Sequence, residues 1–271
     1  YQLRPELPFS PGWEVAGVVR RDVGIFRAGD HVAAMPATGG FAGTVAVDPE
    51  TVFALPRSVP LDKGAAIPLN YLTAHFALTR RARVEAGETI LVHGAAGGVG
   101  TATCQLAAAL GCRVLAVVSS PEKARVARSA GAQETLSVEE FRDQARSLTE
   151  GRGVDVVVDP VGGDRFTDSL RSMATEGRVV VIGFTGRDVP TVKVNRLLLT
   201  NTTVMGAASA EYWRQNPGFV GRQWQDLLPL MESGAIDPPI GQVFALDDAA
   251  DAIRAMDERR AVGRLLIRVH G

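Results

Sequence analysis

Cysteine and lysine are scarce in this sequence, and the scarcity of cysteine argues against two kinds of site. Only Cys104 and Cys112 occur among 271 residues, and both lie within one predicted strand and helix unit. They support neither a disulfide framework nor a cysteine-ligated zinc site. We therefore expect a protein of the reducing cytoplasm. Lysine occurs only at positions 63, 123 and 193, which we interpret as a coding bias of the source genome and not as a sign of function, although each lysine is worth examining.

Long apolar runs and net charge are also lacking. No stretch approaches the roughly 18 consecutive apolar residues of a membrane span, and the formal net charge is −1. We therefore expect neither membrane insertion nor a basic field that would hold nucleic acid. Hydrophobic residues make up 46% of the chain and charged residues 22%. This composition is ordinary for a soluble protein of one large or two medium domains.

The first 60 residues contain short apolar runs separated by proline and glycine. Residues 14–19 and 43–47 have the composition of strands, and residues 28–32 of a turn that leads into a strand. No long helical period occurs in this part of the chain. The pattern predicts a β-rich region.

From about residue 62 the apolar spacing becomes helical and then alternates between helix and strand. Helical spacing covers 62–67 and 71–81. Buried strands are predicted at 89–93, 113–118, 154–158 and 178–182, with helices at 99–110, 122–129 and 164–173. This alternation predicts βαβ units and a parallel sheet, with 203–205 as a candidate last strand. Further helices are predicted near 222–233 and 247–258, followed by a strand at 264–269.

A glycine-rich turn at residues 94–100 joins the strand at 89–93 to the following helix. In a dinucleotide-binding turn the glycines allow the backbone to approach a pyrophosphate, which the N–H groups and the positive helix end then hold. Ala95 replaces the first glycine of the strict pattern. The strand, helix and next strand nevertheless lie where such a site needs them. We predict that Ala96, Gly97, Gly98, Val99 and Gly100 bind a dinucleotide; the alternative is a plain tight turn.

The tip of the next strand favours NADPH over NADH. An NAD site places Asp or Glu there to bind the ribose hydroxyls, but this strand ends in Ser119 and Ser120, and Lys123 follows one helical turn later. Hydroxyl groups and an ammonium attract a 2′-phosphate, whereas a carboxylate repels it. The alternative is that Lys123 only solvates an exposed helix.

With these residues, the sequence resembles the medium-chain dehydrogenase/reductase superfamily, and within it the zinc-free, NADPH:quinone oxidoreductase-like branch. The motifs that carry the resemblance lie at 11–19 (PGWEVAGVV), 29–32 (GDHV), 72–74 (LTA), 87–100 (GETILVHGAAGGVG), 159–163 (DPVGG) and 177–184 (GRVVVIGF). The resemblance implies an α/β fold: a doubly wound Rossmann sheet at 71–206 and a β-rich, GroES-like catalytic domain formed by 1–70 and 207–271. It also implies that the family's first strands are missing before Tyr1, so that the catalytic domain is incomplete.

The branch assignment depends on a replaced metal ligand. Zinc-dependent members carry a histidine ligand in the Gly-x-Glu motif, where this sequence has Trp13, whose indole offers a metal no lone pair. We therefore expect no catalytic metal. Glu14 is then expected to be a structural carboxylate.

The resemblance also assigns roles to individual residues. Thr73 matches a threonine beside the nicotinamide, and Asn70 and Tyr71 are expected to line the same catalytic cleft. The backbone of Gly183, Phe184 and Thr185 is expected to hold the carboxamide. Arg260 is expected to reach the phosphate, and Tyr1 to lie at the substrate rim. Members of the branch commonly form homodimers by pairing the last strand, here 203–205.

Three functions stay open from the sequence. The first is NADPH-dependent hydride transfer to a small quinone or enone, where Asn70 or a tyrosine hydroxyl stabilises the carbonyl oxygen and water or Tyr71 supplies a proton. The second is reduction of a carrier-bound enoyl thioester. The third is a non-enzyme, a redox sensor or structural protein, that keeps only the nucleotide site. His75 and His93 are interpreted as structural.

Overall fold

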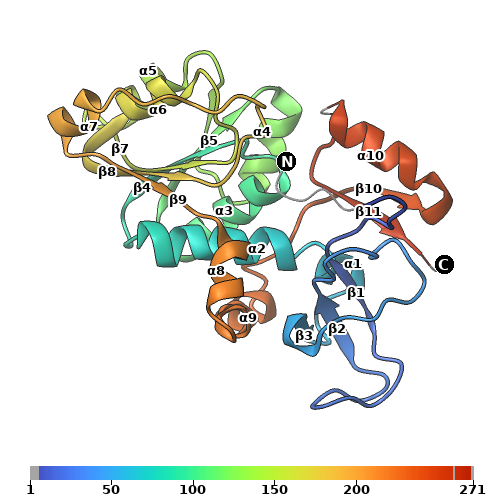
Figure 1. The fold of residues 1–271 in the computed structure, drawn as a ribbon. Helices are drawn as coiled ribbons and strands as arrows, with labels where there is room; N and C mark the ends of the chain where they lie inside the picture. Colours follow the sequence, from blue (N-terminus) through green and yellow to red (C-terminus); the bar gives the residue numbers. More distant parts are fainter. Residues whose placement is uncertain (1–5, 259, 270–271) are drawn as a thin grey trace.

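The structure is a computed structural model that describes residues 6–258 and 260–269. Its centre is a six-stranded, entirely parallel sheet of order β6-β5-β4-β7-β8-β9 (Figure 1). The strands are β4 (Thr89–His93), β5 (Arg113–Val118), β6 (Glu134–Ser137), β7 (Val154–Asp159), β8 (Met173–Val181) and β9 (Thr203–Gly206). The chain runs outward from β4 to β6, then returns to β7 on the other side of β4. The strand order therefore reverses between β4 and β7, at whose carboxyl ends such sheets bind their ligands.

Helices cover both faces of this sheet because successive strand residues point to opposite sides. Ile90 and Val92 pack in the core with α2 (Pro68–His75), α3 (Gly98–Ala109) and α4 (Pro121–Ser129). Leu91 packs on the other face with α5 (Phe141–Leu148) and α6 (Phe166–Arg171), and α7 (Asn195–Thr200) precedes the edge strand β9. This arrangement confirms the predicted Rossmann architecture.

A second region supplies a small antiparallel sheet. Its strands are β1 (Val15–Val18), β2 (His31–Ala34) and β3 (Val52–Ala54), followed by α1 (Leu61–Gly64). The C-terminal part adds α8 (Ser209–Gln215), α9 (Phe219–Glu232), α10 (Ala249–Asp257) and a parallel pair, β10 (Ile240–Ala245) with β11 (Arg264–Arg268). Short 3₁₀ turns occur at η1 (Pro49–Thr51) and η3 (Leu246–Asp248). Figure 1 shows both parts beside the sheet, with α9 below α2.

Trp224 ties α9 to the small sheet. Its ring stacks on Phe53 of β3 with 4.7 Å between centroids, and its indole N–H donates to the carbonyl oxygen of Ala54 at 2.9 Å. Two segments far apart in sequence are thereby joined around one buried aromatic pair. The predicted domain boundary at residue 70 falls inside α2, which contacts both α3 and α9.

Several local predictions need correction. The predicted strand at 43–47 is wrong: β2 pairs with β1 and with β3, and no strand of the described chain pairs with this segment. The predicted helix at 71–81 begins at Pro68 and changes after His75 into a π-helix, η2 (Phe76–Ala82). β8 begins at Met173, before the expected start, and β3, β6, α5, α7, α8 and β10 were not predicted. Among the described residues, no helix is long and apolar enough to cross a membrane.

Candidate nucleotide and acceptor site

The glycine turn brings the start of α3 very close to the end of β4. The Gly97 N–H donates to the Gly94 carbonyl oxygen at 2.9 Å, and Gly94 has a φ of +59°. A Cβ on Gly100 would overlap that same carbonyl oxygen. Glycine is therefore required at position 100 for α3 to start directly against β4.

The amino end of α3 has the form of an anion site. Its N-cap, Gly97, has no side chain, and no side chain caps the first turn. The first N–H groups of a helix lack intrahelical partners. Those of Gly98, Val99 and Gly100 therefore lie at the positive end of α3, beside the buried Ala96. This end can hold a pyrophosphate group.

The three predicted catalytic residues of α2 point in different directions. Asn70 is 5% exposed and its amide lies against the glycine turn, since a Cβ on Gly98 would come within 2.8 Å of Asn70 Oδ1. The Thr73 hydroxyl lies 3.1 Å from the hydroxyl of Ser209 on α8. The structure thus brings Asn70, but not Tyr71, to the turn.

The hydroxyl group of Tyr71 binds a residue outside the glycine turn. Its hydroxyl donates to Gln105 Oε1 at 2.6 Å, and the Gln105 side chain also bonds both main-chain groups of Asp237. Burial, followed by the charge of Asp237, raises the pKa of Tyr71 well above its usual value. We therefore do not retain Tyr71 as a proton donor, because its proton is held between α2 and α3.

The residues predicted to bind a 2′-phosphate lie together at the tip of β5. The Ser120 hydroxyl caps α4 by accepting from the Lys123 N–H at 3.2 Å, and Lys123 Nζ donates to the Ser119 hydroxyl at 3.3 Å. Arg260 and Glu122 of α4 line one pocket of about 340 Å³. Arg260 also donates to Glu258 at 2.6 Å. The fold therefore brings Arg260 to the helix that carries Lys123.

The loop after β8, which holds Gly183, Phe184 and Thr185, is fastened to the end of β7. The Thr185 N–H and hydroxyl donate to the Pro160 carbonyl oxygen at 3.1 and 3.0 Å. The Gly186 N–H donates to the Val161 carbonyl oxygen at 2.8 Å. A Cβ on Gly162 would come within 2.9 Å of the Phe184 ring. The two loops therefore adopt their shapes together.

Asp159 organises these loops, and the sequence reasoning gave it no role of its own. It is fully buried at the end of β7, where Oδ1 accepts from the N–H groups of Val161 and Gly162 at 2.8 and 2.9 Å. Burial raises the pKa of this carboxyl, although the two N–H groups oppose the shift. The available signal was an acid directly after an apolar strand, followed by Pro-Val-Gly-Gly.

The structural role expected for His93 and His75 stays a prediction, and both rings contact polar side chains of the protein. His93 is fully buried at the end of β4, 2.8 Å from the Ser169 hydroxyl, and burial lowers its pKa to about 3. His75 Nδ1 lies 3.0 Å from the Gln223 side-chain nitrogen, and burial lowers its pKa as well. His75 Nε2 also lies 3.6 Å from an Asp226 carboxylate oxygen, whose charge opposes the effect of burial on this pKa. Tyr1 lies outside the described residues.

The residues at the expected zinc position do not fit a metal. Glu14 accepts from the Leu69 N–H at 2.9 Å and pairs with the guanidinium of Arg264, so both carboxylate oxygens are engaged. Trp13 is half exposed and offers no ligand atom. In residues 6–258 and 260–269, no group of three His, Cys, Asp or Glu side chains could hold a metal ion.

The chain is similar in sequence and structure to known oxidoreductases. Residues 98–233 match the family described as zinc-binding dehydrogenase. Quinone oxidoreductase-like protein 2 of Bos taurus is 38% identical over 273 residues, covering 98% of this chain and 78% of that protein. The quinone oxidoreductase of Thermus thermophilus, solved also in complex with NADPH, superposes with a TM-score of 0.87 at 34% identity, covering 99% of this chain and 84% of that one. CurK enoyl reductase gives 0.85 at 26% identity, with 96% and 80% covered.

Proposed function

The chain belongs to the zinc-binding dehydrogenase family and is an NADPH-dependent oxidoreductase of the quinone oxidoreductase type, and we propose that its acceptor is a small quinone or α,β-unsaturated carbonyl. One observation carries the proposal: the buried Asn70 amide lies against the uncapped glycine turn of α3. A polar group for the acceptor and an anion site for the cofactor are thereby adjacent. We further propose that residues 71–206 form the nucleotide domain and 1–70 with 207–271 the catalytic domain.

The chain's own residues would hold the cofactor at three points. The N–H groups of Gly98, Val99 and Gly100 would bind the pyrophosphate at the start of α3. The hydroxyls of Ser119 and Ser120 with the Lys123 ammonium, joined by Arg260, would bind the 2′-phosphate. The loop 183–185, held by its bonds to Pro160, would bind the carboxamide. The bound cofactor supplies the hydride.

Reduction without a metal depends on orientation and on one hydrogen-bond donor. A quinone gains aromaticity when it accepts hydride at one end and a proton at the other, so little further help is needed. An enone accepts hydride at its β-carbon, and the electron pair moves to the carbonyl oxygen, where the Asn70 amide would stabilise it. Water then donates a proton to the α-carbon. The Thr73 hydroxyl, 3.1 Å from Ser209, would help to shape this cleft.

Turnover assays test this proposal directly. The purified protein is mixed with NADPH and either a small quinone or an enone, and loss of reduced nicotinamide absorbance is followed. We expect oxidation of NADPH with at least one acceptor, and a drop of about tenfold in enone turnover for Asn70→Ala, the loss of one buried hydrogen bond. Tight NADPH binding without turnover of any acceptor would contradict the proposal and favour the non-enzyme alternative.

The likeness to CurK enoyl reductase supports a second candidate, reduction of an enoyl thioester. The thioester carbonyl needs the same stabilisation of its oxygen, which Asn70 can provide. The two candidates differ in the acceptor alone. A preference of more than about tenfold in kcat/KM for an enoyl thioester over a quinone would establish the second.

We also propose that the chain is a homodimer joined through β9. Among the described residues this strand forms the edge of the sheet, and one side of its backbone has no neighbouring strand there. Next to it, α7 and the segment before it expose Val189, Val194, Leu198 and Leu199, each more than 70% accessible. An apolar surface that continues an open sheet edge is suited to a second copy of the chain.

A further inference from the structure

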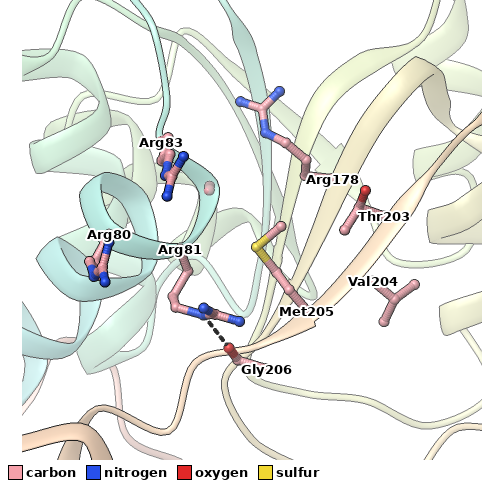
Figure 2. Close-up of a pocket in the computed structure, with 9 residues that line it drawn as sticks. Arg80, Arg81, Arg83, Arg178, Thr203, Val204, Met205 and Gly206 are labelled. Carbon is pink, nitrogen blue, oxygen red and sulfur yellow. Dashed lines mark hydrogen bonds between the residues drawn. The ribbon is translucent and has the colours of Figure 1, made fainter.

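A groove of about 690 Å³ lies beside the edge strand, between the C-terminal end of η2 and strands β8 and β9. Figure 2 shows Arg80, Arg81 and Arg83 on the helical side and Arg178, Thr203 and Met205 on the sheet side. Four arginine residues therefore line one open space.

The positive charge of the groove is largely uncompensated. Within the described part of the chain, Glu88 is the only carboxylate that pairs with any of the four arginines, and it binds Arg178 at 2.7 Å. Arg81 donates through Nε to the Gly206 carbonyl oxygen at 2.7 Å, which carries no charge. Arg80 lies 5.7 Å from the centroid of the Tyr212 ring. The groove thus keeps three net positive charges on Arg80, Arg81 and Arg83.

One wall of the groove also presents an unused donor. The Nε atom of Arg178 is buried and has no hydrogen-bond partner among the described residues, because Glu88 binds only the terminal nitrogen Nη2. A buried donor without an acceptor costs free energy. Because the atom is buried, an oxygen atom in the groove could reach it only if the Arg178 side chain moved.

The backbone that presents these arginines is unusual. Arg80 and Arg81 lie in the π-helix η2, a conformation that is rare and frequent at functional sites. Arg83 ends that helix with a φ of +51°, in the left-handed region that favours glycine or asparagine. Backbone strain of this kind persists where the surroundings require it. Both irregularities fall on the residues that line the groove.

We propose that this groove binds a small oxyanion of the phosphate type with two or more negative charges. Several guanidinium forks can bind phosphate oxygens with charge-assisted hydrogen bonds, and Thr203 adds a hydroxyl. The site is separate from the NADPH site at the tip of β5, because four strand spacings, about 19 Å, separate β5 from β9. The proposal does not depend on the acceptor of the reductase, and in the proposed homodimer the groove would lie beside the joined edges of the two sheets.

Calorimetric titration with inorganic pyrophosphate tests the groove. The protein is first saturated with NADPH, so that pyrophosphate cannot report on the Lys123 site. We expect binding to the wild type and a loss of affinity of about tenfold in Arg83→Gln, the effect of one charge-assisted bond in a partly exposed site. Arg80→Gln should weaken binding in the same direction. Arg57→Gln, which removes an exposed arginine from another part of the surface, should bind as the wild type does.

A second variant guards against a folding defect at position 83. Arg83→Gly removes the charge while glycine accepts the positive φ without strain, so it should fold and lose the same affinity. Arg83→Lys should retain part of the binding. The proposal is overturned if the wild type binds no pyrophosphate, or if Arg83→Gly and Arg80→Gln bind it as tightly as the Arg57→Gln control.

Discussion

The side-chain amide of Asn70 lies so close to Gly98 that a methyl group on the glycine would come within 2.8 Å of the amide oxygen. We expect Gly98→Ala to displace Asn70 and reduce both NADPH affinity and turnover by about tenfold, because the buried amide has little room to move. Gly221→Ala is a matched control, since a Cβ at this helical position meets nothing within 4 Å.

The double variant isolates the steric cause. If Gly98→Ala acts only by displacing Asn70, then Gly98→Ala combined with Asn70→Ala should equal Asn70→Ala alone in both KM and kcat. If the losses of affinity and turnover in the two single variants simply add in the double variant, then Gly98→Ala disturbs cofactor binding independently of Asn70.

Lys123 is predicted to determine the choice of dinucleotide. Its ammonium lies 3.3 Å from the Ser119 hydroxyl at the tip of β5, and its charge is exposed, so the loss on removing it is modest. Lys123→Gln should weaken NADPH binding about fivefold to tenfold and leave NADH binding unchanged. Titrations with both nucleotides measure this. Equal weakening for the two would assign Lys123 to some part of the cofactor other than the 2′-phosphate.

Asp159 is predicted to be a positioning residue for the loop 183–185. Asp159→Ala removes the acceptor of one buried and one partly buried N–H group, and should lower the free energy of unfolding by about 1–3 kcal/mol and raise KM for NADPH. Asp159→Asn keeps an oxygen acceptor and should restore much of both. A KM that remains at the wild-type value in Asp159→Ala, despite the loss of stability, would show that the loop keeps its shape without Asp159.

The fold was predictable from sequence where the signal is local, and the site only in part. The apolar run of β4, the glycines and the following helix lie next to one another in the chain, so their arrangement follows from neighbouring residues. The segment 43–47 has strand composition but no partner strand, which composition cannot reveal. The role of Tyr71 depends on Gln105, 34 residues later. The π-helix η2 keeps ordinary helical spacing, so its sequence alone does not distinguish it.

Acid should destabilise the protein through His93. Burial, followed by the charge of Arg165, lowers the pKa of this imidazole to about 3 from 6.5. His93 of the unfolded chain therefore binds a proton near pH 6.5, whereas His93 of the folded chain binds one only near pH 3. The free energy of unfolding decreases as the pH falls below 6.5 toward 3. Between about pH 7.5 and pH 5 the loss is about 2 kcal/mol. Urea unfolding of the wild type and of His93→Gln across this range should show a shallower decline in the variant; parallel curves would contradict the assignment.

Exposed leucines beside the sheet edge lead to a prediction about assembly. Leu198 and Leu199 are 76% and 79% accessible on α7, directly before β9. If β9 pairs with its copy, these side chains are buried in the dimer, and a carboxylate there would be desolvated. Light scattering should give twice the chain mass of 28.7 kDa for the wild type and the single mass for Leu199→Asp.

A matched variant distinguishes disruption of this interface from a general effect of adding a charge to the protein surface. Ile25 is 85% accessible in a loop between β1 and β2, so Ile25→Asp introduces the same charge at an equally exposed apolar position away from β9. It should leave the mass of the dimer unchanged. Two results would contradict the proposed interface: a wild-type mass of one chain at all concentrations, or a Leu199→Asp variant that stays dimeric. In either case the edge of β9 would be open in solution, and the apolar surface of α7 would need a different partner.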